Sequence, residues 1–136
     1  LSNEFSAACL EAAFKGRSAP VKNALLNQSL IAGIGNIYAN EALFLSGISP
    51  RRKAKTIISG RADRLATAIV TTLRAAIVDG GTSLRDHVQP GGEIGYFVQR
   101  LAVYGQAGKP CPSCGLLIKT IIQSGRSSFY CSRCQR

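Results

Sequence analysis

The chain has 136 residues, of which 17 are Lys or Arg and 7 are Asp or Glu, so its formal net charge is +10. This length allows one modest hydrophobic core with a small appendage. No apolar run is long enough to cross a membrane, which excludes a spanning segment within these residues. The basic excess favours a polyanionic partner, most often nucleic acid. The chain begins at Leu1 and contains no Met, so we expect a processed or excised fragment.

Two short helices are predicted at the start of the chain. Ser2 can cap the first, which Gly16 then stops. The second begins around Pro20, a residue suited to a first helical turn, and continues to Gln28. The apolar residues that recur on one side of the first helix are Phe5, Cys9, Leu10 and Phe14.

Two longer helices follow. Gly33 and Gly35 interrupt the helical pattern before Asn36, whose side chain is typical of a helix N-cap. A third helix is predicted over residues 37–46. The fourth covers residues 59–79, where apolar residues recur every four positions and form one face. Those apolar residues are Leu65, Ile69, Leu73 and Ile77. The four helices together predict the main core.

Past residue 81 the helical period is lost. Residues 89–95 read Gln-Pro-Gly-Gly-Glu-Ile-Gly, a composition that favours turns and a flexible loop. Short strands are predicted at residues 98–104, 116–122 and 128–130, the last two joined by a hairpin turn at residues 124–126.

Four cysteines form the strongest single signal in the sequence. Two Cys-x2-Cys pairs are separated by sixteen residues, the spacing of a four-thiolate zinc ribbon. Such a site has no open position for water, so its metal would stabilise the fold rather than catalyse a reaction. Two disulfides are the less favoured alternative, because Cys9 would remain as a fifth cysteine and nothing resembles a secretory signal. We interpret Cys9 as a small buried apolar residue. The predicted ligands are Cys111, Cys114, Cys131 and Cys134.

Five stretches of sequence occur in a recognisable order. They are Gly-Ile-Gly-Asn-Ile-Tyr-Ala-Asn-Glu-Ala-Leu-Phe at 33–44, Gly-Ile-Ser-Pro at 47–50, Gly-Glu-Ile-Gly-Tyr-Phe at 92–97, Val-Tyr-Gly at 103–105, and Gly-Arg-Ser-Ser-Phe-Tyr-Cys-Ser-Arg-Cys-Gln at 125–135. Together they resemble the C-terminal half of bacterial formamidopyrimidine-DNA glycosylase, over essentially the whole chain. The endonuclease VIII group shares this architecture, but the Gly-Asn-Ile-Tyr-Ala stretch resembles the purine-directed branch more closely.

The resemblance implies a mostly α fold. It consists of a helix-two-turn-helix four-helix domain at residues 1–88, a lid-like flexible loop at 89–97, and a zinc finger, built as a zinc-ribbon hairpin, at 98–136. It also implies one structural Zn²⁺, and the bound zinc thiolates would leave a net charge of roughly +8. The implied partners are damaged double-stranded DNA and the N-terminal catalytic domain missing from this chain. The implied setting is a monomer in the bacterial cytoplasm, associated with the nucleoid and with no membrane.

The implied activity is excision of oxidised purines, 8-oxoguanine and formamidopyrimidines, by a bifunctional DNA glycosylase and abasic-site lyase in base-excision repair. The family nucleophile is an N-terminal proline amine followed by glutamate, and the opening Leu-Ser-Asn-Glu does not match it. The amine must attack the sugar and form an imine before elimination. We therefore expect activity of the full-length parent and none of this chain alone. A non-enzymatic zinc-ribbon module that binds nucleic acid, or a catalytically dead paralogue, is the alternative.

Two places are predicted to contact DNA phosphates. Gly35 and Asn36 stand at the start of the third helix, where free N–H groups and the helix dipole attract an anion. From the residues alone, Asn36 could equally serve only as a cap. Arg126 lies at the hairpin tip, and its guanidinium suits phosphate oxygens. The resemblance implies that Arg126 clamps phosphate and donates a proton in the second elimination.

Three further residues complete the predicted DNA contacts. Tyr104 resembles a phosphate contact of the family, with strand packing as an equal alternative. Arg17 and Lys22 flank the second helix and suit backbone contacts. The remaining basic cluster is predicted to be a solvated face, and comprises Arg51, Arg52, Lys53, Lys55, Arg61 and Arg64.

Overall fold

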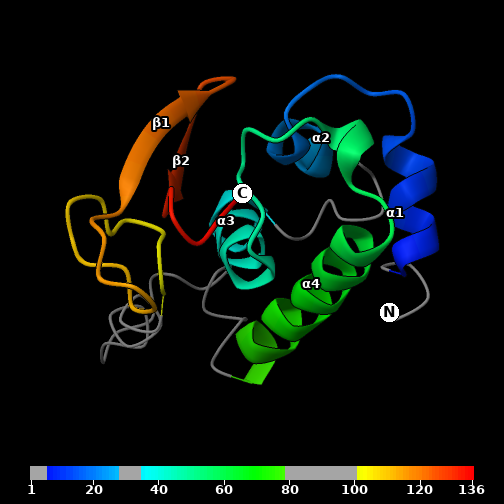
Figure 1. The fold of residues 1–136 in the computed structure, drawn as a ribbon. Coiled ribbons are helices and arrows are strands. Elements are labelled where there is room, and N and C mark those ends of the chain that lie inside the picture. The colour runs from blue at the N-terminus through cyan, green and yellow to red at the C-terminus, as the bar shows by residue number, and fades with distance from the viewer. Residues whose placement is uncertain (1–5, 28–34, 79–100) are drawn as a thin grey trace.

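The computed structural model describes residues 6–27, 35–78 and 101–136. Its elements are α1 (Ala7–Phe14), α2 (Val21–Asn27), α3 (Gly35–Ser46), the short 3₁₀ turn η3 (Ala54–Thr56), α4 (Gly60–Val78), β1 (Lys119–Gln123) and β2 (Arg126–Tyr130). Figure 1 shows α3 between the other helices and the two-stranded antiparallel hairpin. The prediction of four helices followed by a β-hairpin is confirmed. None of the described helices is both long and apolar enough to cross a membrane.

The start of α1 differs from the prediction. Ser6 is its N-cap, because the Ser6 Oγ accepts a hydrogen bond from the backbone N–H of Cys9 at 3.2 Å. The predicted cap at Ser2 is therefore wrong, and Ser2 itself lies outside the described residues. Both serines have a suitable side chain. Leu10 and Phe14 lie one turn apart on the side of α1 that is buried, as the predicted apolar side requires.

The helical core is formed mainly by α3 and α4, with α1 packed on α4 and α2 packed on α3. The predicted apolar face of α4 is confirmed for Leu65 and Ile69, which are fully buried, and Leu73 packs against the same core. The side chain of Ile77 lies outside the described part. Burial of one such side chain contributes about 1.5–3 kcal/mol. Other core residues with almost no exposure are Leu10, Phe14, Val21, Leu25, Leu43, Ile48 and Ile57.

The hairpin pairs β1 with β2 in the register Lys119↔Tyr130 to Gln123↔Arg126. Ser124 and Gly125 form the turn, with φ of 51° and 78°. Positive φ at both central residues is what a type I′ hairpin turn requires, and that turn matches the twist of the strands. Arg126 is therefore the first residue of β2. The predicted turn at residues 124–126 is one residue too long.

Residues 101–104 do not form the predicted strand. The backbone N–H groups of residues 102–104 all donate to the carboxylate of Glu41, at 2.8, 2.9 and 2.9 Å. A side chain of α3 thus accepts the donors that a strand would need for pairing. The other residues of that predicted strand, 98–100, and the predicted loop at 89–97 lie outside the described residues.

Candidate metal centre and nucleic-acid interface

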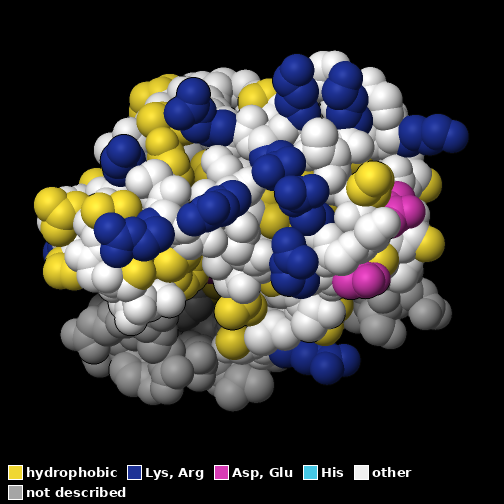
Figure 2. Space-filling view, in the orientation of Figure 1, with side chains coloured by type: hydrophobic (Ala, Val, Ile, Leu, Met, Phe, Trp, Pro, Cys, Tyr) yellow, Lys and Arg dark blue, Asp and Glu magenta, His cyan; other side chains and the backbone are white. Residues whose placement is uncertain are grey.

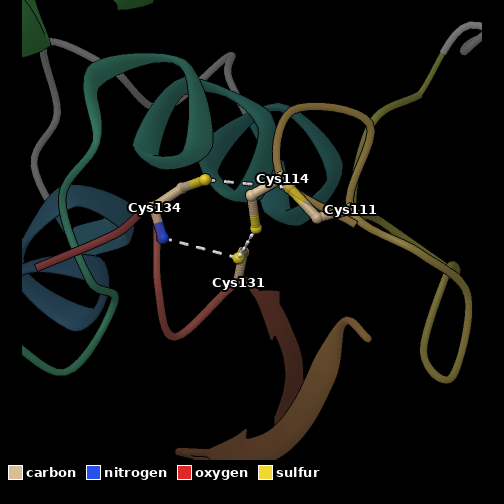
Figure 3. A group of neighbouring side chains, drawn as sticks. All are labelled: Cys111, Cys114, Cys131 and Cys134. Atoms are coloured by element: carbon tan, nitrogen blue, oxygen red, sulfur yellow. Dashed lines mark hydrogen bonds between the residues drawn. The ribbon is translucent and has the colours of Figure 1, made fainter. Parts of the chain in front are cut away.

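The four predicted cysteine ligands converge on one point (Figure 3). Their sulfur atoms all lie within 4.8 Å of one another, with Cys111 to Cys134 at 3.8 Å and Cys114 to Cys131 at 3.5 Å. A tetrahedral zinc with Zn–S bonds of about 2.3 Å places its sulfur ligands about 3.8 Å apart. The observed separations fit a zinc tetrathiolate and are much longer than the about 2.05 Å of a disulfide.

Both pairs sit on tight turns at the open end of the hairpin. Cys111 and Cys114 precede β1, and Cys131 and Cys134 follow β2. Backbone N–H groups point at the sulfurs: that of Ser113 donates to the Cys111 Sγ at 3.3 Å and that of Cys134 to the Cys131 Sγ at 3.4 Å. Such donors favour the thiolate form, which metal ligation requires.

The thiols cannot all ionise without a cation. Burial by itself raises the pKa of Cys111, but hydrogen bonds from the backbone N–H groups of Cys114 and Ser113 outweigh it and lower that pKa to about 7. Burial and the hydrogen bond with Cys114 raise the pKa of Cys134 to about 12. A divalent zinc supplies the positive charge that four neighbouring thiolates need. The predicted single structural zinc is thus confirmed by the chemistry of this ligand set.

The hairpin is fastened to the helical domain beside its tip. The carbonyl oxygen of Ser127 accepts hydrogen bonds from Lys22 Nζ at 3.1 Å, Asn36 Nδ2 at 3.0 Å and Asn40 Nδ2 at 3.5 Å. The Asn40 Oδ1 in turn accepts from the backbone N–H of Phe129 at 2.7 Å. The residue next to Arg126 is therefore tied to both α2 and α3.

Lys22 has a different position from the one predicted. Its side chain is 0% exposed, and its Nζ also donates to the Ser128 Oγ at 2.6 Å. Burial, followed by repulsion from Arg126, lowers the pKa of Lys22 to about 8. In this structure Lys22 joins α2 to the inner side of β2, and its contact with the DNA backbone stays a prediction.

The start of α3 also differs from the prediction. Gly35, and not Ile37, is the first residue of the helix, with φ of +67°, so Asn36 lies inside the first turn and is not the N-cap. The amide of Asn36 instead bonds the hairpin at Ser127, while its buried Oδ1 has no hydrogen-bond partner among the described residues. Gly35 is exposed at the positive end of the helix dipole.

The other predicted contacts lie in separate places. Arg126 is exposed at the start of β2, next to the fastened Ser127. Tyr104 is half-buried and meets Phe129 edge to face, with ring centroids 5.0 Å apart. Arg17 is exposed, and its Nε donates to the carbonyl of Ala13 at 2.7 Å, at the negative end of α1. A phosphate contact remains a prediction for Arg17, Tyr104 and Arg126.

Two structural residues were missed. Asn40 and Glu41 hold β2 and residues 102–104 against α3. Asn40 lies four positions after Asn36 and so shares its face of α3, whereas Glu41 points about 100° further around the helix. That polar pattern inside a predicted helix is the signal that could have identified them.

Comparison with known proteins agrees with the predicted helical domain and zinc finger. Residues 1–88 match the family model of the formamidopyrimidine-DNA glycosylase H2TH domain, and residues 108–136 match the zinc finger found in FPG and IleRS. Formamidopyrimidine-DNA glycosylase from Ruegeria sp. is 52% identical over 138 residues, covering all of this chain and 49% of that protein. The enzyme of the same name from Acidiphilium cryptum is 50% identical over 141 residues, covering 51% of its length.

Solved structures agree with these relatives. MutM (Fpg) from Thermus thermophilus has a TM-score of 0.83 at 39% identity, covering 96% of this chain and 50% of that one. A complex between the Lactococcus lactis Fpg and DNA containing an abasic site has a TM-score of 0.84 at 32% identity, covering 97% of this chain and 48% of that one. This chain spans about half the length of the curated relatives it matches. With a family model matched over residues 1–88, the chain belongs to the formamidopyrimidine-DNA glycosylase family.

Proposed function

We propose that these residues are the DNA-binding half of a bifunctional glycosylase and abasic-site lyase that removes oxidised purines in base-excision repair. The observation that carries the proposal is the triple hydrogen bond to the Ser127 carbonyl. It ties the hairpin residue beside Arg126 to Asn36, in the first turn of α3. Both predicted phosphate-binding groups, the end of α3 and the Arg126 guanidinium, are thereby held in a fixed relation.

Zinc supports DNA binding indirectly, by holding the hairpin that carries Arg126. The metal, held by the four cysteines, fixes the open end of the hairpin, and Lys22, Asn36 and Asn40 fix the end near the turn. Arg126 can then meet phosphate without ordering the backbone on binding, which saves conformational entropy. We place the function in the bacterial cytoplasm, with damaged duplex DNA as the partner and a monomer as the working form.

The DNA contact is tested by the salt dependence of duplex binding. If about three phosphates are neutralised, the slope of log K against log salt is about −2.7. Arg126→Ala should reduce that slope by roughly one unit and weaken binding to all sequences alike. Arg133→Ala is the matched control, since it removes another exposed arginine of the ribbon, and it should leave the slope close to wild type. Equal slopes for wild type and Arg126→Ala would reject the clamp.

The chemistry is proposed to require residues that this sequence does not contain. The amino-terminal Pro-Glu implied by the family is absent from the 136 residues. We expect the chain alone to bind DNA with 8-oxoguanine or an abasic site but to neither cleave it nor form an imine trapped by borohydride. An intact relative serves as the positive control. Cleavage or trapping by a clean preparation would mean that the nucleophile lies within this chain.

A further inference from the structure

An open, basic pocket lies between the loop after α3 and the open end of the hairpin. Its volume is about 630 Å³, and five of its lining residues are cations: Arg51, Arg52, Lys53, Lys119 and Arg136. Among the described residues that line it there is no Asp or Glu. Three cations of the predicted solvated cluster, at residues 51–53, therefore lie beside Lys119 and Arg136, which are far away in sequence. The charged side chains that line the pocket are therefore all positive.

The pocket is built by specific contacts and not by chance proximity of long side chains. The Arg52 Nε donates to the carbonyl oxygen of Arg136 at 2.6 Å, and the Arg52 Nη1 donates to the Thr56 Oγ1 at 3.3 Å. Below them the buried amide of Gln135 donates to the carbonyl of Ile48 at 2.9 Å. These bonds hold the chain end against the loop after α3, so the cations face a preformed space.

One of the pocket cations, Arg52, is partly buried and repelled by a further arginine that does not line the pocket. Burial, and then repulsion from Arg61, lower the pKa of Arg52. Figure 2 shows Lys and Arg side chains spread over this face, with the few acidic side chains over α1 and α4. Like charges at close range repel each other, and an anion between them would relieve that repulsion.

The lining favours a phosphate backbone over an acidic protein segment. Besides the cations it offers the hydroxyls of Ser49, Thr56 and Ser132, which are donors commonly used toward phosphate oxygens. Protein partners are held mainly by large apolar anchors in pockets. The one aromatic ring in the lining, Tyr130, is only 7% exposed and so offers little surface for such an anchor.

The pocket lies at the other end of α3 from the proposed lesion contacts. The proposed phosphate site is at the first residue of α3, Gly35, whereas the pocket adjoins the other end, where the N–H of Arg136 donates to the carbonyl of Gly47 at 2.9 Å. A helix of 12 residues is about 18 Å long. The two sites therefore lie at opposite ends of α3.

We propose that this pocket binds the sugar-phosphate backbone of a second DNA segment while the first is held at Gly35 and Arg126. The identity of the first site rests on the proposed function; the second site rests on the pocket. A chain with two such sites can pass directly from one duplex segment to another, because the second segment binds before the first is released.

The test compares two triple variants of equal charge. The pocket variant is Arg51→Ala, Lys53→Ala and Lys119→Ala. All three side chains are exposed, and none of them donates a hydrogen bond within the described residues. The control is Lys15→Ala, Arg74→Ala and Lys109→Ala, which removes one arginine and two lysines from exposed positions outside the pocket. Both should remain folded by circular dichroism.

Two measurements are made with short duplexes at low salt. Stoichiometry should be two duplexes per chain for wild type and control and one for the pocket variant. Arg126→Ala should still bind two duplexes, with a weaker affinity at the first site. The dissociation rate of a labelled duplex should rise with unlabelled competitor for wild type and control. For the pocket variant the slope of that rise should fall by about tenfold, which corresponds to about 1.4 kcal/mol of second-segment binding.

The outcomes distinguish failure of the second site from failure of the proposed function. One duplex per wild-type chain, or equal behaviour of the pocket and control variants, would overturn the second site. Wild-type affinity of Arg126→Ala at the first site would contradict the proposed function while leaving the pocket intact. If wild type bound a poly-glutamate peptide through Arg51, Lys53 and Lys119 but no second duplex, the pocket would belong to an acidic protein and the proposal would be wrong.

Discussion

Removal of zinc should unfold the ribbon and leave the helical domain folded. The ribbon has few buried apolar residues of its own, mainly Val103 and Ile118 beside the cysteines. Structural zinc contributes about 10–16 kcal/mol to such small domains. The helical core, with fully buried Leu10, Leu43 and Leu65, does not depend on the metal. Chelation should therefore keep most of the far-UV helical signal while amide protection is lost over residues 108–136.

The same result should follow from a single ligand change. Cys131→Ala removes a buried ligand and should abolish stoichiometric zinc, whereas Cys9→Ala, in α1, should retain one zinc per chain. Elemental analysis gives the ratio directly. Wild-type protein without zinc, two disulfides by mass spectrometry, or a ribbon that keeps its amide protection after chelation would each contradict this account.

Lys22 should give the domain a stability that rises with pH above about 8. In the folded chain burial and Arg126 lower the pKa of Lys22 from 10.5 to about 8. Between these values the unfolded chain holds the proton and the folded chain does not, so stability increases with pH and the gain is complete above 10.5. The span corresponds to about 3 kcal/mol, at 1.36 kcal/mol per pH unit. Below pH 8 both forms are protonated and the cost of burying the charge is fully present.

The measurement is the free energy of unfolding by denaturant at several pH values from 7 to 11. Lys22→Met is one atom shorter than lysine and has no titrating group, so wild type should gain about 3 kcal/mol relative to it across the interval. Lys55→Met, which removes an exposed ammonium from η3, is the control and should follow wild type. Parallel curves for wild type and Lys22→Met would show that burial of this ammonium does not couple to folding.

Local patterns were sufficient to predict the zinc site and most of the helices. The spacing of the two Cys-x2-Cys pairs favours a metal site over two disulfides, and the sulfur positions bear this out. The period of Leu65 and Ile69 likewise fixed the buried face of α4. The buried face of α4 depends on residues close in sequence. The zinc site depends on a cysteine spacing that is typical of a zinc ribbon.

Long-range contacts were not predictable in this way. Lys22 carries a charge that usually stays in water, and only the distant Ser127 and Ser128 explain its burial. Residues 101–104 are the apolar run Leu-Ala-Val-Tyr, which suits a strand, but Glu41 accepts the donors of residues 102–104. The pocket cations likewise come from segments about seventy or more residues apart in sequence, and single-sequence patterns do not encode such neighbours.

The attachment of α3 on several sides has an evolutionary consequence. Asn36 and Asn40 reach β2, Glu41 reaches residues 102–104, and Gly47 just beyond the helix meets the chain end. One residue inserted within α3 would rotate everything after it by about 100°. Asn36 would keep its partner while Glu41 turned away from its three N–H groups. Insertions and deletions among proteins built this way should therefore accumulate in the connecting loops and be absent from α3.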